Sequence, residues 1–207
     1  MIKMIKKTLI FSTAVLITVL FCGCLGYRET NGGLAVSLIG IDRSSEGIRI
    51  TVQTVLPDTE GKVDCETVSA TDENIQKAYQ RLKNKMIKPP ILEHCIGACL
   101  GATLHKNDVL EFLDFAEKKP DINLSLNFFY TTDAMSFIME SGNLRQGGFD
   151  VIELIKNNSK TFENKLFMIK RELHKGSIAR VPFVIFKGEE AVIEKTVILE
   201  GLGSFEN

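Results

Sequence analysis

The stretch LAVSLIGIDRSSEGIRITVQTVL, residues 34–56, decides the fold. Its first part, Leu34–Ile41, is apolar at nearly every position, which is typical of a strand buried on both faces. Residues 42–47 are polar and end in glycine, which predicts a turn. From Ile48 to Leu56, apolar residues alternate with arginine, threonine and glutamine, which indicates a half-buried strand. The two strands together predict a β-hairpin at the start of a globular domain.

Further helices and strands are predicted downstream of this hairpin. Residues Pro57–Asp64 have the composition of a loop, and Thr71 is expected to cap a helix over Thr71–Lys88 that Pro89-Pro90 ends. The other expected strands are Ile91–Ala102, Ile122–Tyr130, Val181–Phe186 and Ala191–Leu199, and the other expected helices are one from Asn107 or Asp108 to Pro120, Ala134–Glu140, Asp150–Asn158 and Thr161–His174. This order predicts an α+β fold with a mixed or antiparallel sheet and several packed helices, rather than a doubly wound parallel sheet.

The composition narrows the class of protein. The chain has 207 residues, 44% of them hydrophobic, with 25 basic against 26 acidic side chains. These values exclude a disordered chain and a multi-span membrane protein. The near-zero net charge also argues against nucleic-acid binding, which usually needs a basic excess. The length fits one sizeable domain, or one domain plus a fragment.

The N-terminal residues have the pattern of an exported lipoprotein. A lysine-rich start is followed by an apolar stretch over residues 8–21 and then by Phe21-Cys22-Gly23-Cys24. A small residue before a cleavage site is typical of signal peptides, so we expect cleavage after Gly23 and a diacylglycerol on Cys24. Alternatively, residues 8–27 form a helix of about 30 Å that stays as a membrane anchor. Either way, the lysines remain cytoplasmic and the rest of the chain lies outside.

This pattern divides the chain into four parts. Residues 1–23 are the predicted lipoprotein signal peptide, and residues 24–33 are the lipidated cysteine with a short polar tether. Residues 34–188 form the predicted α+β domain. Residues 189–207 are a strand and the C-terminal end, interpreted as the start of a following domain that is missing. Without the signal peptide, 184 residues remain with a formal charge of −4.

The cysteines are a candidate chemical site. Cys65, Cys95 and Cys99 are an odd number, so they cannot all pair within the domain. If Ile91–Ala102 is one strand, Cys95 and Cys99 lie on the same face about 13 Å apart, too far for a disulfide. Two interpretations remain: buried structural cysteines, or a thiol enzyme that uses Cys95 or Cys99.

Other chemistry has little support in the sequence. His94 and Cys95 would face opposite ways on a strand, and His105 and His174 are isolated, so no metal site is predicted. Nucleophile elbows, P-loops and dinucleotide-binding motifs are not found. We therefore predict no catalytic residue, no metal and no cofactor. The basic side of the Thr71–Lys88 helix is either a solvated surface or a contact for anionic lipid headgroups.

Several segments together resemble the Ger(x)C family, the C-subunit lipoproteins of spore nutrient germinant receptors. In chain order they are Gly23-Cys24 with Arg28-Glu29, AVSLIGID at residues 35–42, ITVQ at residues 50–53, Glu93-His94, VLEFLDFA at residues 109–116, and Ala179-Arg180-Val181-Pro182. The resemblance extends over nearly the whole exported chain, and the order and spacing of the motifs carry it.

The resemblance implies a non-enzymatic lipoprotein, lipidated at Cys24, on the outer face of the inner spore membrane. It would act with integral membrane subunits of the A and B types and would bind no nucleic acid. Any interaction with the nutrient germinant would be indirect. Leu25-Gly26 stands where the family often has Trp-Asp, and family members are nearly twice as long, so the chain resembles an N-terminal-domain-only or truncated form. The alternative function is a lipoprotein that binds a solute for uptake.

Overall fold

The computed structural model describes residues 32–57, 63–158 and 165–200. The predicted signal peptide, Cys24 and most of the tether lie outside these residues. From Gly33 on, the described residues belong to one compact unit.

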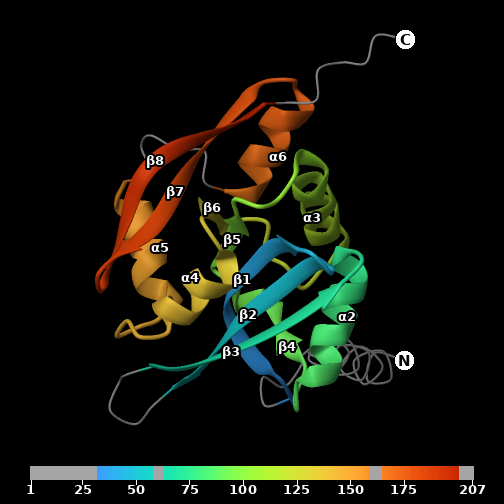
Figure 1. The fold of residues 1–207 in the computed structure, drawn as a ribbon, viewed down its shortest axis with the longest axis vertical. Helices are drawn as coiled ribbons and strands as arrows, with labels where there is room; N and C mark the ends of the chain where they lie inside the picture. The colour runs from blue at the N-terminus through green and yellow to red at the C-terminus, as the bar shows by residue number, and fades with distance from the viewer. Residues whose placement is uncertain (1–31, 58–62, 159–164, 201–207) are drawn as a thin grey trace, which may run out of the picture. The chain divides into compact units, whose positions relative to one another are not determined.

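A mixed eight-stranded sheet forms the centre of this unit (Figure 1). The strand order is β3-β2-β1-β5-β6-β7-β8, and β4 pairs with the start of β1. The strands are β1 Leu34–Ser44, β2 Gly47–Pro57, β3 Val63–Asp72, β4 Pro90–Ile91, β5 Gly97–Gly101, β6 Asn127–Thr131, β7 Ile178–Lys187 and β8 Glu190–Glu200. The central strands β1, β5, β6 and β7 run parallel, whereas β1–β2–β3 and β7–β8 pair antiparallel. The predicted α+β class with a mixed sheet is confirmed.

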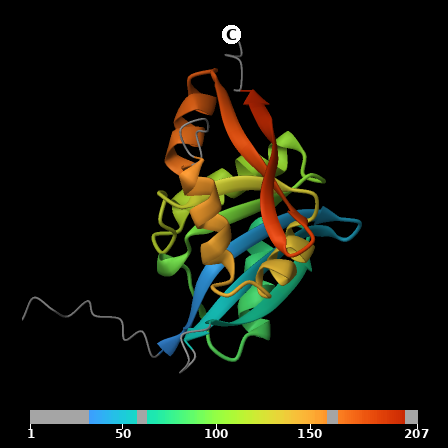
Figure 2. The same ribbon diagram turned by 90° about the vertical axis from the view of Figure 1, so that its left-hand side faces the viewer.

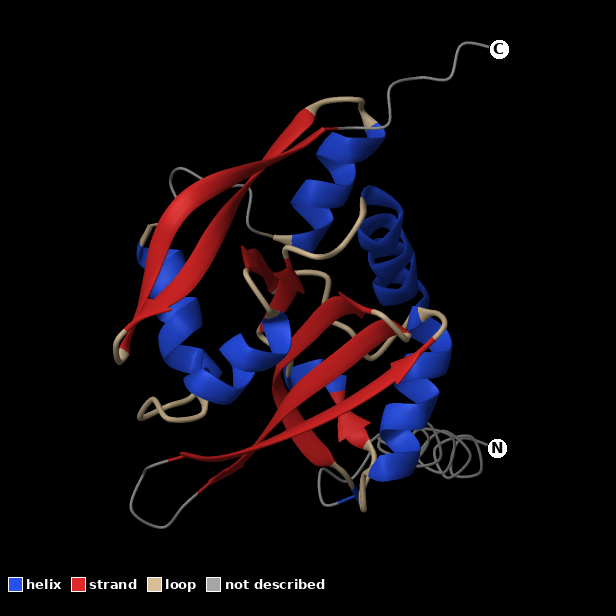
Figure 3. Cartoon of the chain, viewed as in Figure 1, coloured by secondary structure: helices blue, strands red, loops and turns tan. Residues whose placement is uncertain are grey.

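Helices cover both faces of the sheet (Figures 1 and 3). In the described residues these are α2 Ile75–Lys85, α3 Lys106–Lys118, α4 Ala134–Ser141, α5 Gly148–Asn157 and α6 Leu166–His174. The larger core cluster packs α2, α3 and α6 on one face, and the smaller cluster packs α4 and α5 on the other. Because β1 and β6 are covered on both sides, residues 36–42 of β1 and all of β6 are buried without alternation.

Strand β3 was not predicted from the sequence. Residues Val63–Asp72 form β3, paired with β2 along its whole length, so the expected loop ends before Val63 and Thr71 lies in a strand. The helix cap is instead Asn74, whose side chain accepts a hydrogen bond from the backbone N–H of Lys77 at 2.9 Å. The polar sequence of β3 hid it, because threonine and serine favour caps and turns as well as edge strands.

Two expected strands are also shorter than predicted. Residues 91–102 divide into the end of β4, a 3-10 turn at Leu92–His94, and β5. The turn places Cys95 in the larger core cluster and Cys99 in the smaller one, so the expected shared face is wrong. Similarly, Ile122 and Leu126 are buried in a turn before β6. There the Asn123 side chain accepts from the backbone of Ser125, which competes with strand pairing.

A β-bulge allows the β7–β8 hairpin to pack against both core clusters. The register shifts between Phe183 and Val184, where Glu194 on β8 is the extra residue. A bulge of this kind changes which face the following side chains point to. As a result, Val197 packs against the larger cluster and Ile193 against the smaller one. Figure 2 shows this hairpin in front of the other strands.

Candidate functional site

The thiols in the domain are free and largely enclosed. Cys95 and Cys99 are buried, and Cys65 is partly exposed. The Sγ of Cys95 lies 3.3 Å from the carbonyl oxygen of Gly97. Burial raises the pKa of Cys95 to about 12 and raises the pKa of Cys99 well above its usual range. Since the thiolate is the nucleophile, these positions suit packing rather than thiol chemistry.

Alkylation of the folded chain tests this interpretation. We expect iodoacetamide at neutral pH to leave Cys95 and Cys99 unmodified, because both are buried and protonated, and to modify the partly exposed Cys65 slowly. All three should react in urea. Peptide mass mapping reports each site, and rapid modification of Cys99 in the native chain would restore the thiol-enzyme interpretation.

The histidines and acidic residues do not assemble a metal centre. Among the described residues, there is no group of three or more His, Cys, Asp or Glu side chains that could hold an ion. His94 is exposed in the 3-10 turn, and the backbone N–H of His105 donates to Asp108 at 2.8 Å at the start of α3. His174 lies in the last turn of α6. Each histidine therefore has its own separate environment.

A buried ionic network joins the first hairpin to α4. Asp42 is fully buried and accepts hydrogen bonds from the backbone N–H groups of Ala134 at 2.8 Å and Met135 at 3.0 Å. Arg49 lies opposite Asp42 in the hairpin register and donates to it at 3.1 Å. The same guanidinium reaches Asp133, the N-cap of α4, at 2.6 Å. Negative charge at a helix N-terminus is favourable, so the network fixes α4 on the sheet.

The surroundings shift the pKa values of Asp42 and Asp133 in opposite directions. Burial is the main cause that raises the pKa of Asp42. Burial also acts on Asp133, but hydrogen bonds from Ser136 and the charge of Arg49 outweigh it and lower its pKa. Gly101 leaves room for Asp42, because a Cβ at this position would lie 1.9 Å from the Asp42 Oδ1. The network is thus built into the packing of β5 against β1.

A second buried network centres on Gln53. Its Oε1 accepts from the Ser37 hydroxyl at 2.7 Å and from the backbone N–H of Gly148 at 2.9 Å. Its Nε2 donates to the carbonyl of Ile138 at 3.0 Å and to the hydroxyl of Ser141 at 2.8 Å. One side chain therefore links β1, β2, α4 and α5, and a satisfied buried network of this kind specifies a single packing arrangement.

An ion pair between Arg43 and Asp108 joins β1 to α3 and makes stability depend on pH. The Arg43 Nε donates to Asp108 at 2.8 Å, and this hydrogen bond is the leading cause that lowers the pKa of Asp108. The stabilisation is complete above about pH 4, the usual carboxyl range, and is lost as the pH falls through the lowered value. Asp108→Asn should therefore flatten the acid limb of a urea-unfolding pH profile. An unchanged slope would contradict this role.

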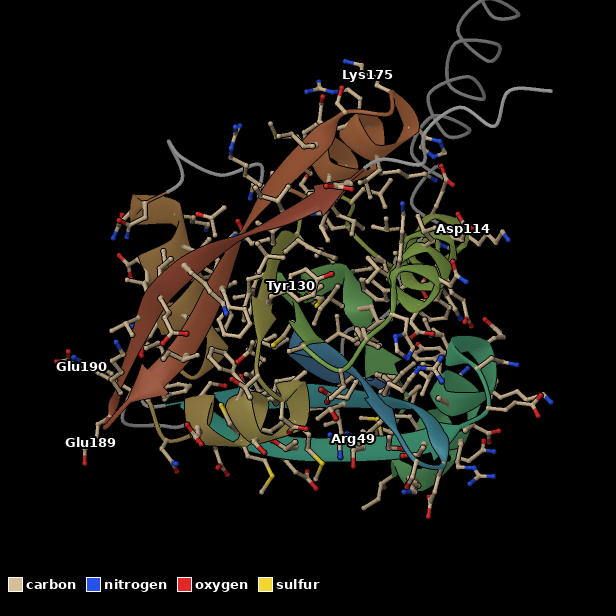
Figure 4. The ribbon with its side chains drawn as sticks, turned by 45° about the horizontal axis from the view of Figure 1, so that its top comes forward. Arg49, Asp114, Tyr130, Lys175, Glu189 and Glu190 are labelled. Carbon is tan, nitrogen blue, oxygen red and sulfur yellow. The ribbon has the colours of Figure 1, made fainter. Side chains whose placement is uncertain are left out.

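Two surface hollows border α3 and α6. One, of about 370 Å³, lies beside the end of β8 and includes Leu110, Leu173 and Tyr130 in its lining. Figure 4 shows Tyr130 between the β7–β8 hairpin and α3. The other, of about 580 Å³, includes the partly exposed Leu124 and Phe167. Apolar side chains are therefore exposed on this side of the domain.

The fold and the buried networks define the class of protein: an α+β domain in which Asp42 and Gln53 hydrogen-bond helices to the sheet. Residues 26–179 match the family model of the spore germination protein N-terminal domain, and the chain belongs to this family. Its role is therefore related to spore germination. No curated protein and no solved structure is significantly similar to the chain. In the residues that the structure describes, no helix is long and apolar enough to cross a membrane.

The match ends at residue 179, the second residue of β7, so most of the β7–β8 hairpin lies beyond it. The hairpin nevertheless continues the same sheet. Of the residues singled out from the sequence, Cys24 lies outside the described part, and Cys95 and Cys99 are kept apart by the sheet. The ionic network was not predicted from the sequence. The predicted hairpin places Asp42 opposite Arg49, and this pairing could have indicated an ion pair.

Proposed function

We propose that the chain is the membrane-anchored, non-catalytic lipoprotein subunit of a spore nutrient germinant receptor. The observation that carries this proposal is the family match, which begins at residue 26, two residues after the predicted lipidated cysteine. The buried polar networks of the domain serve packing, which supports a role in assembly. Its partners would be integral membrane subunits of the A and B types.

In this proposal the lipid fixes the protein on the outer face of the inner spore membrane. A diacylglycerol on Cys24 supplies two acyl chains, which suffice for stable anchoring. The domain would then act as a docking platform beside the membrane subunits. The apolar side that carries α3 and α6 is available for contact with parts of those subunits that lie outside the bilayer.

Metabolic labelling with an alkyne fatty acid tests the anchor. We expect the wild-type chain and Cys22→Ala to be labelled equally and Cys24→Ala to be unlabelled, because only the cysteine after Gly23 fits the cleavage pattern. Cys22→Ala is the matched control, two residues away in the same leader. Equal labelling of the wild-type chain and Cys24→Ala would contradict lipidation at Cys24.

A further inference from the structure

The segment between α2 and β4 lies where the domain begins. The backbone N–H of Leu34 donates to the carbonyl of Pro89 at 3.0 Å, and Leu34 pairs with Pro90 in the β1–β4 ladder. Gly33 is packed so closely here that a Cβ would lie 2.6 Å from the Pro89 oxygen. Figure 1 shows the start of β1, β4 and the end of α2 together at the bottom of the domain. The segment between α2 and β4 therefore lies next to the point where the tether enters the domain.

This segment combines an apolar tip with positive charge. Ile87 is 100% exposed, the highest value among the large apolar side chains that the structure describes. Lys85 and Lys88 lie on either side of it and are exposed, and Lys83 precedes them in α2. Within the described residues, these three lysines form no ion pair with a carboxylate, although Lys85 donates to the carbonyl of Ser69 at 2.9 Å. A fully exposed isoleucine between lysines matches the chemistry of an anionic bilayer surface.

The rest of the α2 surface is electrostatically different. Lys77 pairs with Glu73, and Arg81 pairs with Asp72 at 3.0 Å, so these cations at the start and middle of the helix are partly neutralised. The unneutralised charge is concentrated toward the C-terminal end of α2, next to Ile87. The exposed Glu93 is the acidic residue that follows in this part of the chain. Three lysines against one glutamate leave residues 83–93 positively charged.

The length of the tether makes contact with the membrane geometrically easy. If Cys24 carries the lipid, nine residues, 25–33, connect it to the domain. Nine residues span at most about 30 Å when extended, and a flexible chain of this length averages about 17 Å. The start of β1, and with it Ile87, is then confined near the headgroups. This step rests on the proposed lipid anchor.

We propose that residues 83–88 form a docking surface for an anionic phospholipid bilayer. Ile87 inserts between the headgroups, and Lys83, Lys85 and Lys88 lie against their negative charge. The domain is then oriented, with the start of β1 toward the bilayer and the end of β8 away from it. Figures 1 and 2 show that these two points lie at opposite ends of the domain.

Tryptophan fluorescence tests this orientation, because the chain contains no tryptophan. The full lipidated chain would carry Ile87→Trp and be reconstituted into vesicles of phosphatidylglycerol and phosphatidylethanolamine with brominated acyl chains. The matched control is Ile198→Trp, an exposed isoleucine on β8 at the far end of the domain. We expect Ile87→Trp to give blue-shifted emission that the bromines quench, and Ile198→Trp to stay unquenched.

The outcomes separate the surface from the anchor. If the chain fails to float with the vesicles, the lipid anchor of the proposed function fails. If it floats and Ile87→Trp is no more quenched than Ile198→Trp, the docking surface is overturned while the anchor stands. That result would leave a protein partner as the occupant of this segment.

The lysines give a second, independent readout. In the Ile87→Trp background, Lys85→Gln and Lys88→Gln should each lower the ratio of docked to undocked domain about fivefold, since a basic residue near an anionic surface contributes about 1 kcal/mol. Lys77→Gln is the control, because that lysine already pairs with Glu73. Equal quenching of all three variants, or equal quenching in purely zwitterionic vesicles, would contradict the electrostatic part of the proposal.

Discussion

Asp42→Ala should lower the free energy of unfolding by about 3 kcal/mol. The substitution leaves Arg49 without its buried partner, and removing one member of a buried ion pair costs about 3–5 kcal/mol. It also leaves the backbone N–H groups of Ala134 and Met135 at the start of α4 without their acceptor. We place the loss at the lower limit because Arg49 keeps Asp133 and its side chain is 23% exposed.

Urea unfolding followed by circular dichroism measures this effect. Asp114→Ala is the control, an exposed aspartate on α3 whose replacement should change stability by less than about 0.5 kcal/mol (Figure 4). Asp42→Asn should be milder than Asp42→Ala, because one amide oxygen still accepts a hydrogen bond. Equal stability of Asp42→Ala and Asp114→Ala would show that the network does not hold α4.

Gln53→Met should be comparably destabilising, by about 3 kcal/mol. Methionine has a similar length but leaves the Gly148 N–H without its acceptor and removes the three other side-chain hydrogen bonds of Gln53, to Ser37, Ile138 and Ser141. Each buried group left unsatisfied costs about 1–3 kcal/mol, and local rearrangement recovers part of the sum. Because Gln53 links two strands to two helices, the loss should extend to the packing of α4 and α5.

The same substitution at Gln80 is the control. Gln80 is exposed on α2, so Gln80→Met should be nearly neutral. Thermal unfolding together with amide hydrogen exchange would separate the two variants. Faster exchange in α4 and α5 of Gln53→Met is expected, and wild-type exchange there would contradict the role of the network.

The fold class followed from local patterns that the tertiary structure did not override. The apolar run of Leu34–Ile41 and the alternation after Ile48 predicted β1 and β2, and the expected strands Val181–Phe186 and Ala191–Leu199 lie within β7 and β8. β3 was missed because its sequence is polar and its strand geometry depends on pairing with β2. The two shortened strands reflect a 3-10 turn and an asparagine turn, which apolar periodicity does not detect.

The interior contacts were less accessible from sequence. Gln53 alternates with apolar residues in its strand and therefore looked solvent-facing, yet α4 and α5 cover that face and bury it. Its partners Ser141 and Gly148 lie about 90 residues away in the chain, and no local pattern relates them. The basic charge of α2 was visible in the sequence, whereas its closeness to the start of β1 needed the β4 pairing.

The central claim is that this chain is an anchored subunit of a nutrient germinant receptor. The most direct measurement is germination of spores that lack the gene, complemented with the wild-type chain, Cys22→Ala or Cys24→Ala. We predict that the wild-type chain and Cys22→Ala restore nutrient-triggered germination, that Cys24→Ala does not, and that non-nutrient germination is equal in all strains. A normal nutrient response in the strain without the gene, with no paralogue present, would contradict the account.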